Sequence, residues 1–161
     1  MIATVSLNPA IDRTMTADDL VTGEVNRMKS SVQYAGGKGI NVTKMLRKLG
    51  EEVCALGFLG GFAGKFILDY LETIGVDCRF TMVPSETRTS LNIITDSGEV
   101  TEILEPGAVI PAECEKEFRV ALCEAAAGTK TIVMSGSLTT GLHDGYYAEL
   151  IEICSTTDTK V

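Results

Sequence analysis

The sequence predicts an α/β fold in which a parallel sheet has helices on both faces and a small, partly solvated second sheet lies apart from the main core. Short apolar, β-branched runs alternate along the chain with longer segments of helical periodicity, which is the pattern of strand–helix–strand units. The turn signal Asp96-Ser97-Gly98 separates two strand-like segments that carry many polar residues, and such arms are typical of a hairpin with a solvated face.

The first half of the chain provides two strands and two helices. The apolar run 2–7 ends at Asn8-Pro9, and it predicts a buried strand followed by a turn. Apolar residues recur at helical spacing over 39–49, so this segment predicts an amphipathic helix that is entered through a glycine loop. Residues 53–59 predict a second strand, and residues 63–74 predict a second helix.

The second half continues the alternation. The expected elements are a strand over 76–83, a hairpin with arms over 89–95 and 99–104, a helix over 112–127, a strand over 131–134 and a helix over 146–154. We expect the segment 23–35 to join the hairpin in the small sheet. Lys160-Val161 resembles the start of a further strand, so the sequence ends in the middle of the pattern.

Composition limits the classes of partner. The 161-residue chain has a formal net charge of −8 and no cluster of Lys and Arg, so nucleic acid is excluded as a partner. No apolar run reaches the length of a membrane span, and residues 1–7 are too short for a signal-peptide core. We therefore expect a cytoplasmic protein without a membrane partner. The five scattered cysteines, which form no C-x-x-C pair, indicate reduced core residues.

The strongest motif is the glycine loop at 35–42. Gly36 and Gly37 let the backbone approach a ligand closely, and the helix that follows points its free N–H groups outward. A flexible turn before a helix would explain the glycines, but it would not explain Lys38 and Asn41 on the first turn. The pattern favours a cradle for an anion or for hydroxyl groups.

Two nucleotide-binding motifs are excluded by spacing. The segment 59–66 superficially resembles a P-loop, but Leu59 stands where the first glycine is needed and Phe66 replaces the Ser or Thr that would hold magnesium. A dinucleotide fingerprint also fails, because the first strand leads into residues 8–12 and not into G-x-G-x-x-G.

The chain resembles the pfkB family of ribokinase-like carbohydrate kinases, in particular the branch of 1-phosphofructokinases and tagatose-6-phosphate kinases. The resemblance spans the whole chain and rests on residues 8–12, 25–27, 35–43, 57–61, 86–90, 101–107 and 135–138. One departure is Thr139-Thr140, where the family commonly has a proline, and it predicts a looser loop.

The resemblance implies a ribokinase-like three-layer fold with a small β-lid, whose segments lie at about 12–34 and 84–106. Residues 1–161 would then be the amino-terminal part of a sugar-kinase domain. The carboxy-terminal ATP-binding part and the catalytic base would lie beyond Val161, so that the chain is truncated and inactive on its own. In relatives the lid pairs two subunits, and a homodimer through the lid is therefore expected.

The resemblance also implies roles for individual residues. Asp12 would accept two sugar hydroxyls, and Arg27, Lys38 and Arg88 would hold the phosphate of the substrate. The remaining contacts would come from Gly36, Gly37, Asn41, Ser90 and Ser137. Without the family, Asp12 reads as a turn residue after Asn8-Pro9, and each cation reads as a solvated surface charge. His143, the only histidine, is expected to be a loop residue without a catalytic role.

The implied reaction is ATP- and Mg²⁺-dependent phosphorylation of a ketose phosphate, with fructose 1-phosphate as the first choice and tagatose 6-phosphate as the alternative. A hypothesis from another class is that the 161 residues are a non-catalytic sugar-phosphate-binding fragment.

Overall fold

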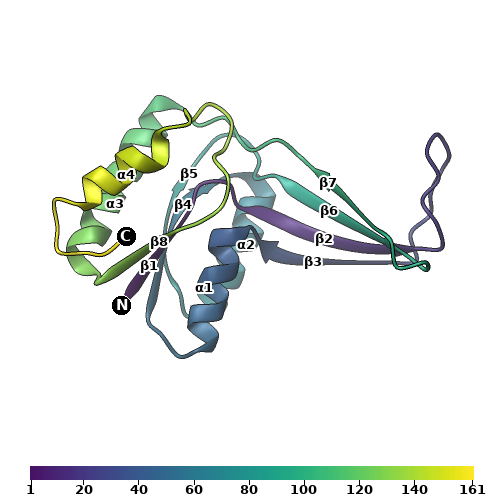
Figure 1. Ribbon diagram of the computed structural model, residues 1–161, viewed down its shortest axis with the longest axis horizontal. Coiled ribbons are helices and arrows are strands. Elements are labelled where there is room, and N and C mark those ends of the chain that lie inside the picture. The colour runs from purple at the N-terminus through teal and green to yellow at the C-terminus, as the bar shows by residue number, and fades with distance from the viewer.

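The computed structural model describes residues 1–161 and contains two four-stranded sheets (Figure 1). The main sheet is entirely parallel and has the strand order β5-β4-β1-β8. Its strands are β1 (Ile2–Ser6), β4 (Val53–Leu59), β5 (Asp77–Met82) and β8 (Thr131–Met134). The second sheet, called the lid sheet below, extends away from the main sheet. Its strands are β2 (Ala10–Ala17), β3 (Ser30–Gly36), β6 (Thr89–Thr95) and β7 (Val100–Leu104).

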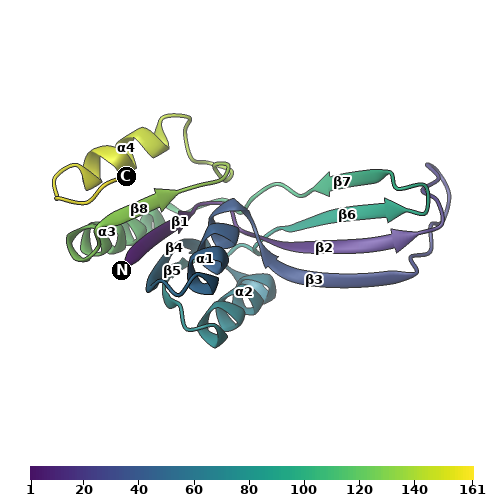
Figure 2. The same ribbon diagram turned by 60° about the horizontal axis from the view of Figure 1, so that its bottom comes forward.

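Four helices cover the two faces of the main sheet (Figure 2). On one face lie α1 (Lys38–Lys48) and α2 (Gly61–Thr73), which pack on β1, β4 and β5. On the other face lie α3 (Ala112–Gly128) and α4 (Tyr146–Cys154), and α3 packs on β4 and β5. Helix, sheet and helix form the three layers that the sequence predicts.

Alternate residues of β4 explain why both faces are covered. Leu56 and Phe58 belong to the core under α3 and α4, where the ring centroids of Phe58 and Phe118 are 4.8 Å apart. Ala55 and Leu59 belong to the opposite core, under α1 and α2. A strand that is buried on both faces needs an uninterrupted apolar run, and the sequence of β4 has one.

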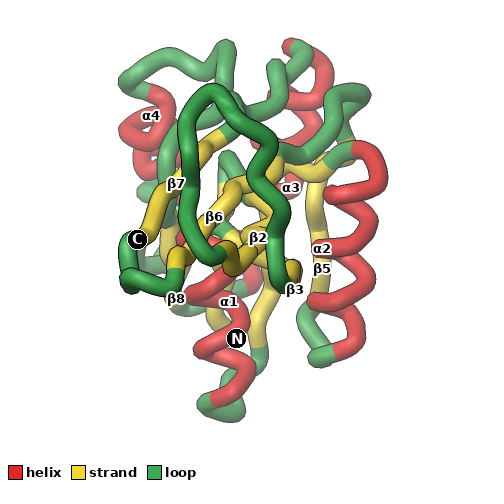
Figure 3. Tube along the Cα trace, turned by 90° about the vertical axis from the view of Figure 1, so that its right-hand side faces the viewer, coloured by secondary structure: helices red, strands yellow, loops and turns green.

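The lid sheet has the order β3-β2-β6-β7, with β2 parallel to β6 and both outer pairs antiparallel. The loop 18–29, which joins β2 to β3, lies at the outer end of this sheet (Figure 3). Lys29 pairs with Asp18 and with Asp96, the latter at 2.7 Å, and so ties this loop to the β6–β7 turn. The lid sheet is therefore joined to the main body at one end and is closed by ion pairs at the other.

Most of the predicted elements are confirmed within a few residues, and β2 is the strand that the sequence reasoning missed. The sequence suggests a turn after the first strand, whereas residues 10–17 form the strand at the centre of the lid sheet. The strand-like end of the chain is confirmed, because Lys160 bridges Thr131 in parallel with β8. No helix of the protein combines the length and the apolar character that a membrane crossing requires.

Candidate functional site

The candidate site is a pocket of about 270 Å³ at the junction of the two sheets, formed by β2, β6, β7 and the first turn of α1. Its lining residues are Asp12, Gly37, Lys38, Asn41, Arg88, Ser90, Asn92, Glu102 and Leu104. Six of the nine substrate-binding residues that the sequence predicts therefore meet in one place. Larger hollows of about 720 and 470 Å³ lie beside the end of α3 and along β8, and they contain none of the predicted residues.

The amino terminus of α1 opens into this pocket. Gly37 enters the helix with φ of 94°, in the left-handed region that glycine tolerates, and no side chain caps the helix. The first intrahelical bond runs from the Asn41 N–H to the Gly37 carbonyl at 2.9 Å. The backbone N–H groups before Asn41 thus lack intrahelical acceptors, and they can bind an anion or hydroxyl oxygens.

Asp12 lies on β2, opposite Ser90 of β6, and Gly36 makes room for its carboxylate. A Cβ atom at Gly36 would lie 2.0 Å from Oδ2 of Asp12, so any larger residue would displace the carboxylate. No hydrogen bond within the chain uses the Asp12 side chain, whereas Arg13 next to it is bonded to Gln33 at 3.0 Å. The Asp12 carboxylate is consequently available to accept hydroxyl donors from a ligand.

Lys38 and Arg88 supply the positive charge of the pocket. Lys38 is exposed and has no ion-pair partner in the chain. Arg88 donates to the carbonyls of Asn8 and Glu105 through two long bonds of 3.4 Å, and its buried Nε has no partner. A guanidinium held so loosely retains donors for a carboxylate or phosphate ligand.

Three predicted residues do not line the pocket: Gly36, which adjoins the Asp12 carboxylate, Arg27 and Ser137. Arg27 was expected on a lid strand, but it lies in the loop 18–29 at the outer end of the lid sheet. The Lys29 N–H donates there to the carbonyl of Thr16, which lies four residues, or about 13 Å, along β2 from Asp12. Arg27 is not among the residues that line the pocket with Lys38 and Arg88.

Ser137 also differs from the expectation. Its hydroxyl accepts a hydrogen bond from Nδ2 of Asn8 at 3.1 Å, and the same amide donates to the carbonyl of Leu138. The loop is not loose, because buried Thr139 donates to the Ala108 carbonyl at 2.6 Å. Ser137 thus helps to fix this loop beside α1 and does not line the pocket.

Three lining residues were missed in the sequence: Asn92, Glu102 and Leu104. The strand register pairs Asn92 with Glu102 and Ser90 with Leu104, on the face that carries Asp12. The period of two along a strand would have found Asn92 from Ser90, since residues i and i+2 share a face. The partners on β7 needed the register of the hairpin, which the sequence leaves open.

The segment that resembles a P-loop is occupied by the chain itself. The N–H of Ala63 in the first turn of α2 donates to Oε1 of Glu86 at 2.6 Å, and the N–H of Gly60 donates to Oγ1 of Thr87 at 2.9 Å. A carboxylate therefore holds the position that a nucleotide phosphate would take. No group of three or more His, Cys, Asp and Glu side chains is placed to hold a metal ion.

Two further charged groups lie outside the pocket. Lys44 of α1 donates to the Ala35 carbonyl at 2.6 Å, and burial lowers its pKa although the nearby charge of Asp12 opposes this effect. Arg119 of α3 bonds to Glu149 of α4, and this contact lowers the pKa of the Glu149 carboxyl. The first contact fixes the end of β3 against α1, and the second joins α3 to α4.

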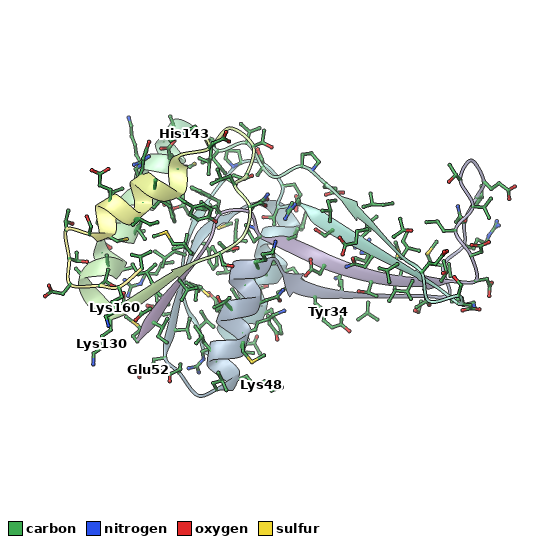
Figure 4. All side chains as sticks on the ribbon, in the orientation of Figure 1. Tyr34, Lys48, Glu52, Lys130, His143 and Lys160 are labelled. Carbon is green, nitrogen blue, oxygen red and sulfur yellow. The ribbon has the colours of Figure 1, made fainter.

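His143 is part of the second group. Its Nε2 lies 2.8 Å from Oε1 of Glu149, and its ring contacts Tyr146 edge to face with centroids 5.8 Å apart. His143 lies on the α4 side of the molecule, away from the lid sheet (Figure 4). The structure gives it contacts that support the start of α4.

Comparison with known proteins points to one family. Residues 4–161 match the family described as pfkB family carbohydrate kinase. The chain is 40% identical over 153 residues to tagatose-6-phosphate kinase of Staphylococcus epidermidis, covering 95% of this chain and 49% of the relative. The chain thus spans about half the length of the curated relatives it matches.

The chain is also similar to solved structures of phosphofructokinases. A "possible 1-phosphofructokinase" from Thermotoga maritima superposes with a TM-score of 0.89 at 31% identity, over 99% of this chain and 52% of that one. Phosphofructokinase-2 from Escherichia coli in complex with fructose-6-phosphate gives 0.90 at 25% identity, over 99% and 53%. The same enzyme has been solved as a tetrameric inhibited form, with a TM-score of 0.89 at 25% identity, over 98% and 52%.

Proposed function

The chain belongs to the pfkB family of carbohydrate kinases, and from this premise we propose that the full-length protein transfers the γ-phosphoryl group of ATP to a hydroxymethyl group of a ketose phosphate. The observation that carries the proposal is the pocket at the sheet junction. It brings together two cations without ion-pair partners, a carboxylate without a hydrogen-bond partner and an uncapped helix amino terminus. A sugar phosphate presents the complementary groups, namely a dianion and several hydroxyls.

The residues of this chain bind and orient the substrate. Lys38 and Arg88 hold the phosphate that the ketose already carries, because a dianion needs several cationic donors. Asp12 accepts hydrogen bonds from two hydroxyls, and Asn41 and Ser90 complete the hydroxyl contacts. Holding the acceptor hydroxyl in one orientation lowers the entropy cost of transfer, and positioning is, with electrostatic stabilisation, what a protein contributes to phosphoryl transfer.

ATP and Mg²⁺ would supply the phosphoryl group and the neutralisation of its charge. Within residues 1–161, the one segment that resembles a nucleotide loop is bonded to Glu86 of the same chain. We propose that the nucleotide site and the catalytic base are contributed by residues beyond Val161.

The substrate is proposed to be fructose 1-phosphate, which would yield fructose 1,6-bisphosphate. The likeness to the "possible 1-phosphofructokinase" from T. maritima supports this choice. Tagatose 6-phosphate is the second candidate, and the 40% identity to the S. epidermidis kinase favours it.

The test is a substrate panel with the full-length protein. We expect ATP-dependent turnover, with kcat/KM for one of the two ketose phosphates at least about tenfold above that for the other. A full-length protein that turns over no ketose phosphate with ATP and Mg²⁺ would refute the kinase proposal. Calorimetric binding of a ketose phosphate without turnover would instead support the non-catalytic alternative.

We further propose that two copies associate through their lid sheets. The face of the lid sheet that carries Asp12 also exposes large apolar side chains on both outer strands, with Val32 and Tyr34 on β3 and Val100 and Leu104 on β7. Tyr34 is labelled in Figure 4. Apolar side chains gathered on one sheet face favour association with another protein surface.

A lid-mediated dimer is also the arrangement in which Arg27, at the outer end of the lid sheet, could act on a phosphate. The test is light scattering at micromolar concentration. Val32→Glu is the disrupting variant, and Val120→Glu, at an exposed position of α3, is the matched control. We expect the wild type and the control to be dimers and Val32→Glu to be a monomer. A strictly monomeric wild-type protein would remove the proposal.

A further inference from the structure

The pocket has an acidic side that the substrate roles above leave unexplained. Glu102 of β7 stands directly opposite Asn92 of β6, one strand repeat farther out along the lid than Ser90. Both side chains line the pocket, and neither makes a hydrogen bond within the chain. Polar side chains elsewhere in the lid sheet do have partners: Thr16 bonds to Ser30 at 2.7 Å.

A comparison with a neighbouring glutamate shows why this lack of a partner matters. Glu105, just beyond the end of β7, accepts a hydrogen bond from the Thr89 N–H at 2.8 Å and therefore has a structural role. Glu102 has no such bond, although it lies in a pocket that also contains two cations. A charged side chain on the edge strand β7 also discourages pairing with another sheet, but that role does not require the charge to face the pocket.

We propose that Glu102, together with Asn92, determines the orientation in which the ketose phosphate binds. Asn92 and Glu102 accept hydrogen bonds from sugar hydroxyls on the lid side, while the phosphate lies against Lys38 and Arg88. This inference rests on the proposed function, because it assigns the direction of the substrate in the same site. It makes Glu102 a specificity-determining residue that distinguishes ketoses by the end that carries the phosphate.

The physical basis is charge repulsion over a short distance. Glu102 lines the same pocket as Lys38 and Arg88, so a phosphate bound in the reverse orientation would lie within about one Debye length, about 8 Å, of the Glu102 carboxylate. A dianion and a carboxylate about 6 Å apart repel each other by about 1.4 kcal/mol even at the dielectric constant of water, which is tenfold in binding. Hydroxyl groups meet no such penalty, and they gain a charged acceptor.

The experiment measures the ratio of kcat/KM for two isomeric substrates, and this ratio does not depend on the fraction of folded protein. In the full-length protein, kcat/KM is determined for fructose 1-phosphate and for fructose 6-phosphate, which differ only in the end that is phosphorylated. Glu102→Gln keeps the shape and removes the charge, and we expect the ratio between the preferred and the disfavoured isomer to fall about tenfold. The matched control is Glu99→Gln, a charge change in the β6–β7 turn outside the pocket, which should leave the ratio unchanged.

A second variant tests the opposite direction. Asn92→Asp adds a negative charge beside Glu102, and the ratio should rise. A ratio for Glu102→Gln within twofold of the wild type would overturn the inference, as would an equal fall in Glu99→Gln or an Asn92→Asp ratio that does not rise. If the wild type turns over neither isomer and no tagatose 6-phosphate either, the proposed kinase function fails. The orientation is then decided by the ratio of calorimetric dissociation constants for the same two isomers, with the same outcomes.

Discussion

Replacing Lys38 with Ala should weaken the binding of a phosphorylated ketose and leave the unphosphorylated sugar nearly unaffected. The substitution removes no structural contact, because the Lys38 side chain is exposed and has no partner in the chain. A hydrogen bond to a charged group contributes about 1.5 to 3 kcal/mol. Arg88 stays in place with a free Nε and compensates in part. We therefore expect a loss near the lower end, which is about tenfold in kcat/KM.

Asp12→Ala should lower kcat/KM for both the phosphorylated and the unphosphorylated ketose, because it removes hydroxyl contacts that both sugars share. Steady-state kcat/KM of the full-length protein is measured for the ketose phosphate and the free ketose, with Lys48→Ala, an exposed cation at the far end of the same helix, as the control. Equal losses from Lys38→Ala on both sugars would refute the phosphate role of Lys38. A normal Asp12→Ala enzyme would remove Asp12 from the site, and an effect of Lys48→Ala equal to that of Lys38→Ala would indicate a general charge effect.

Two further predictions concern stability. Glu86→Gln should lower the free energy of unfolding by about 1 kcal/mol, since a charged acceptor at the start of α2 is lost; an unchanged urea midpoint would contradict the capping role. The hydrogen bond from Arg119 is the largest cause that lowers the pKa of the Glu149 carboxyl in the folded protein. The contribution of Glu149 to the free energy of unfolding is therefore fully present above the ordinary pKa of 4.5, and it is lost as the pH falls through the lower folded pKa. Between pH 5 and about 3, wild type should lose more stability than Glu149→Gln, and parallel pH curves from urea titrations would exclude this contribution.

The main sheet could be predicted from the sequence because its strands are buried on both faces. Continuous apolar runs such as that of β4 identify strands without any knowledge of their partners. The lid strand β2 could not be predicted in this way. Asp12, Arg13, Thr14 and Thr16 give it no apolar alternation, and its extended form depends on pairing with β6, which begins about seventy residues later in the chain.

The same difference separates the site residues that were predicted from those that were missed. Lys38 and Asn41 follow a glycine loop at a fixed spacing, so the local sequence places them on one helix turn. Arg27 and Glu102 have positions that only the strand register decides. The register of β2 with β3 carries Arg27 to the outer end of the lid sheet, and the register of β6 with β7 brings Glu102 opposite Asn92.

The two glycine-entered helices show how far local sequence can specify a binding site. Both α1 and α2 begin at glycines without a side-chain cap from the residue before the helix, and both would present N–H groups to an anion. At α2 the carboxylate of Glu86, twenty-three residues beyond Ala63, already accepts one of these groups. At α1 no acidic side chain of the chain bonds to the helix start, and the nearby carboxylate of Asp12 is directed over Gly36. Whether a glycine loop binds a ligand therefore depends on whether a distant part of the same chain provides an acceptor first, and this is a property of the fold that the loop sequence alone cannot contain.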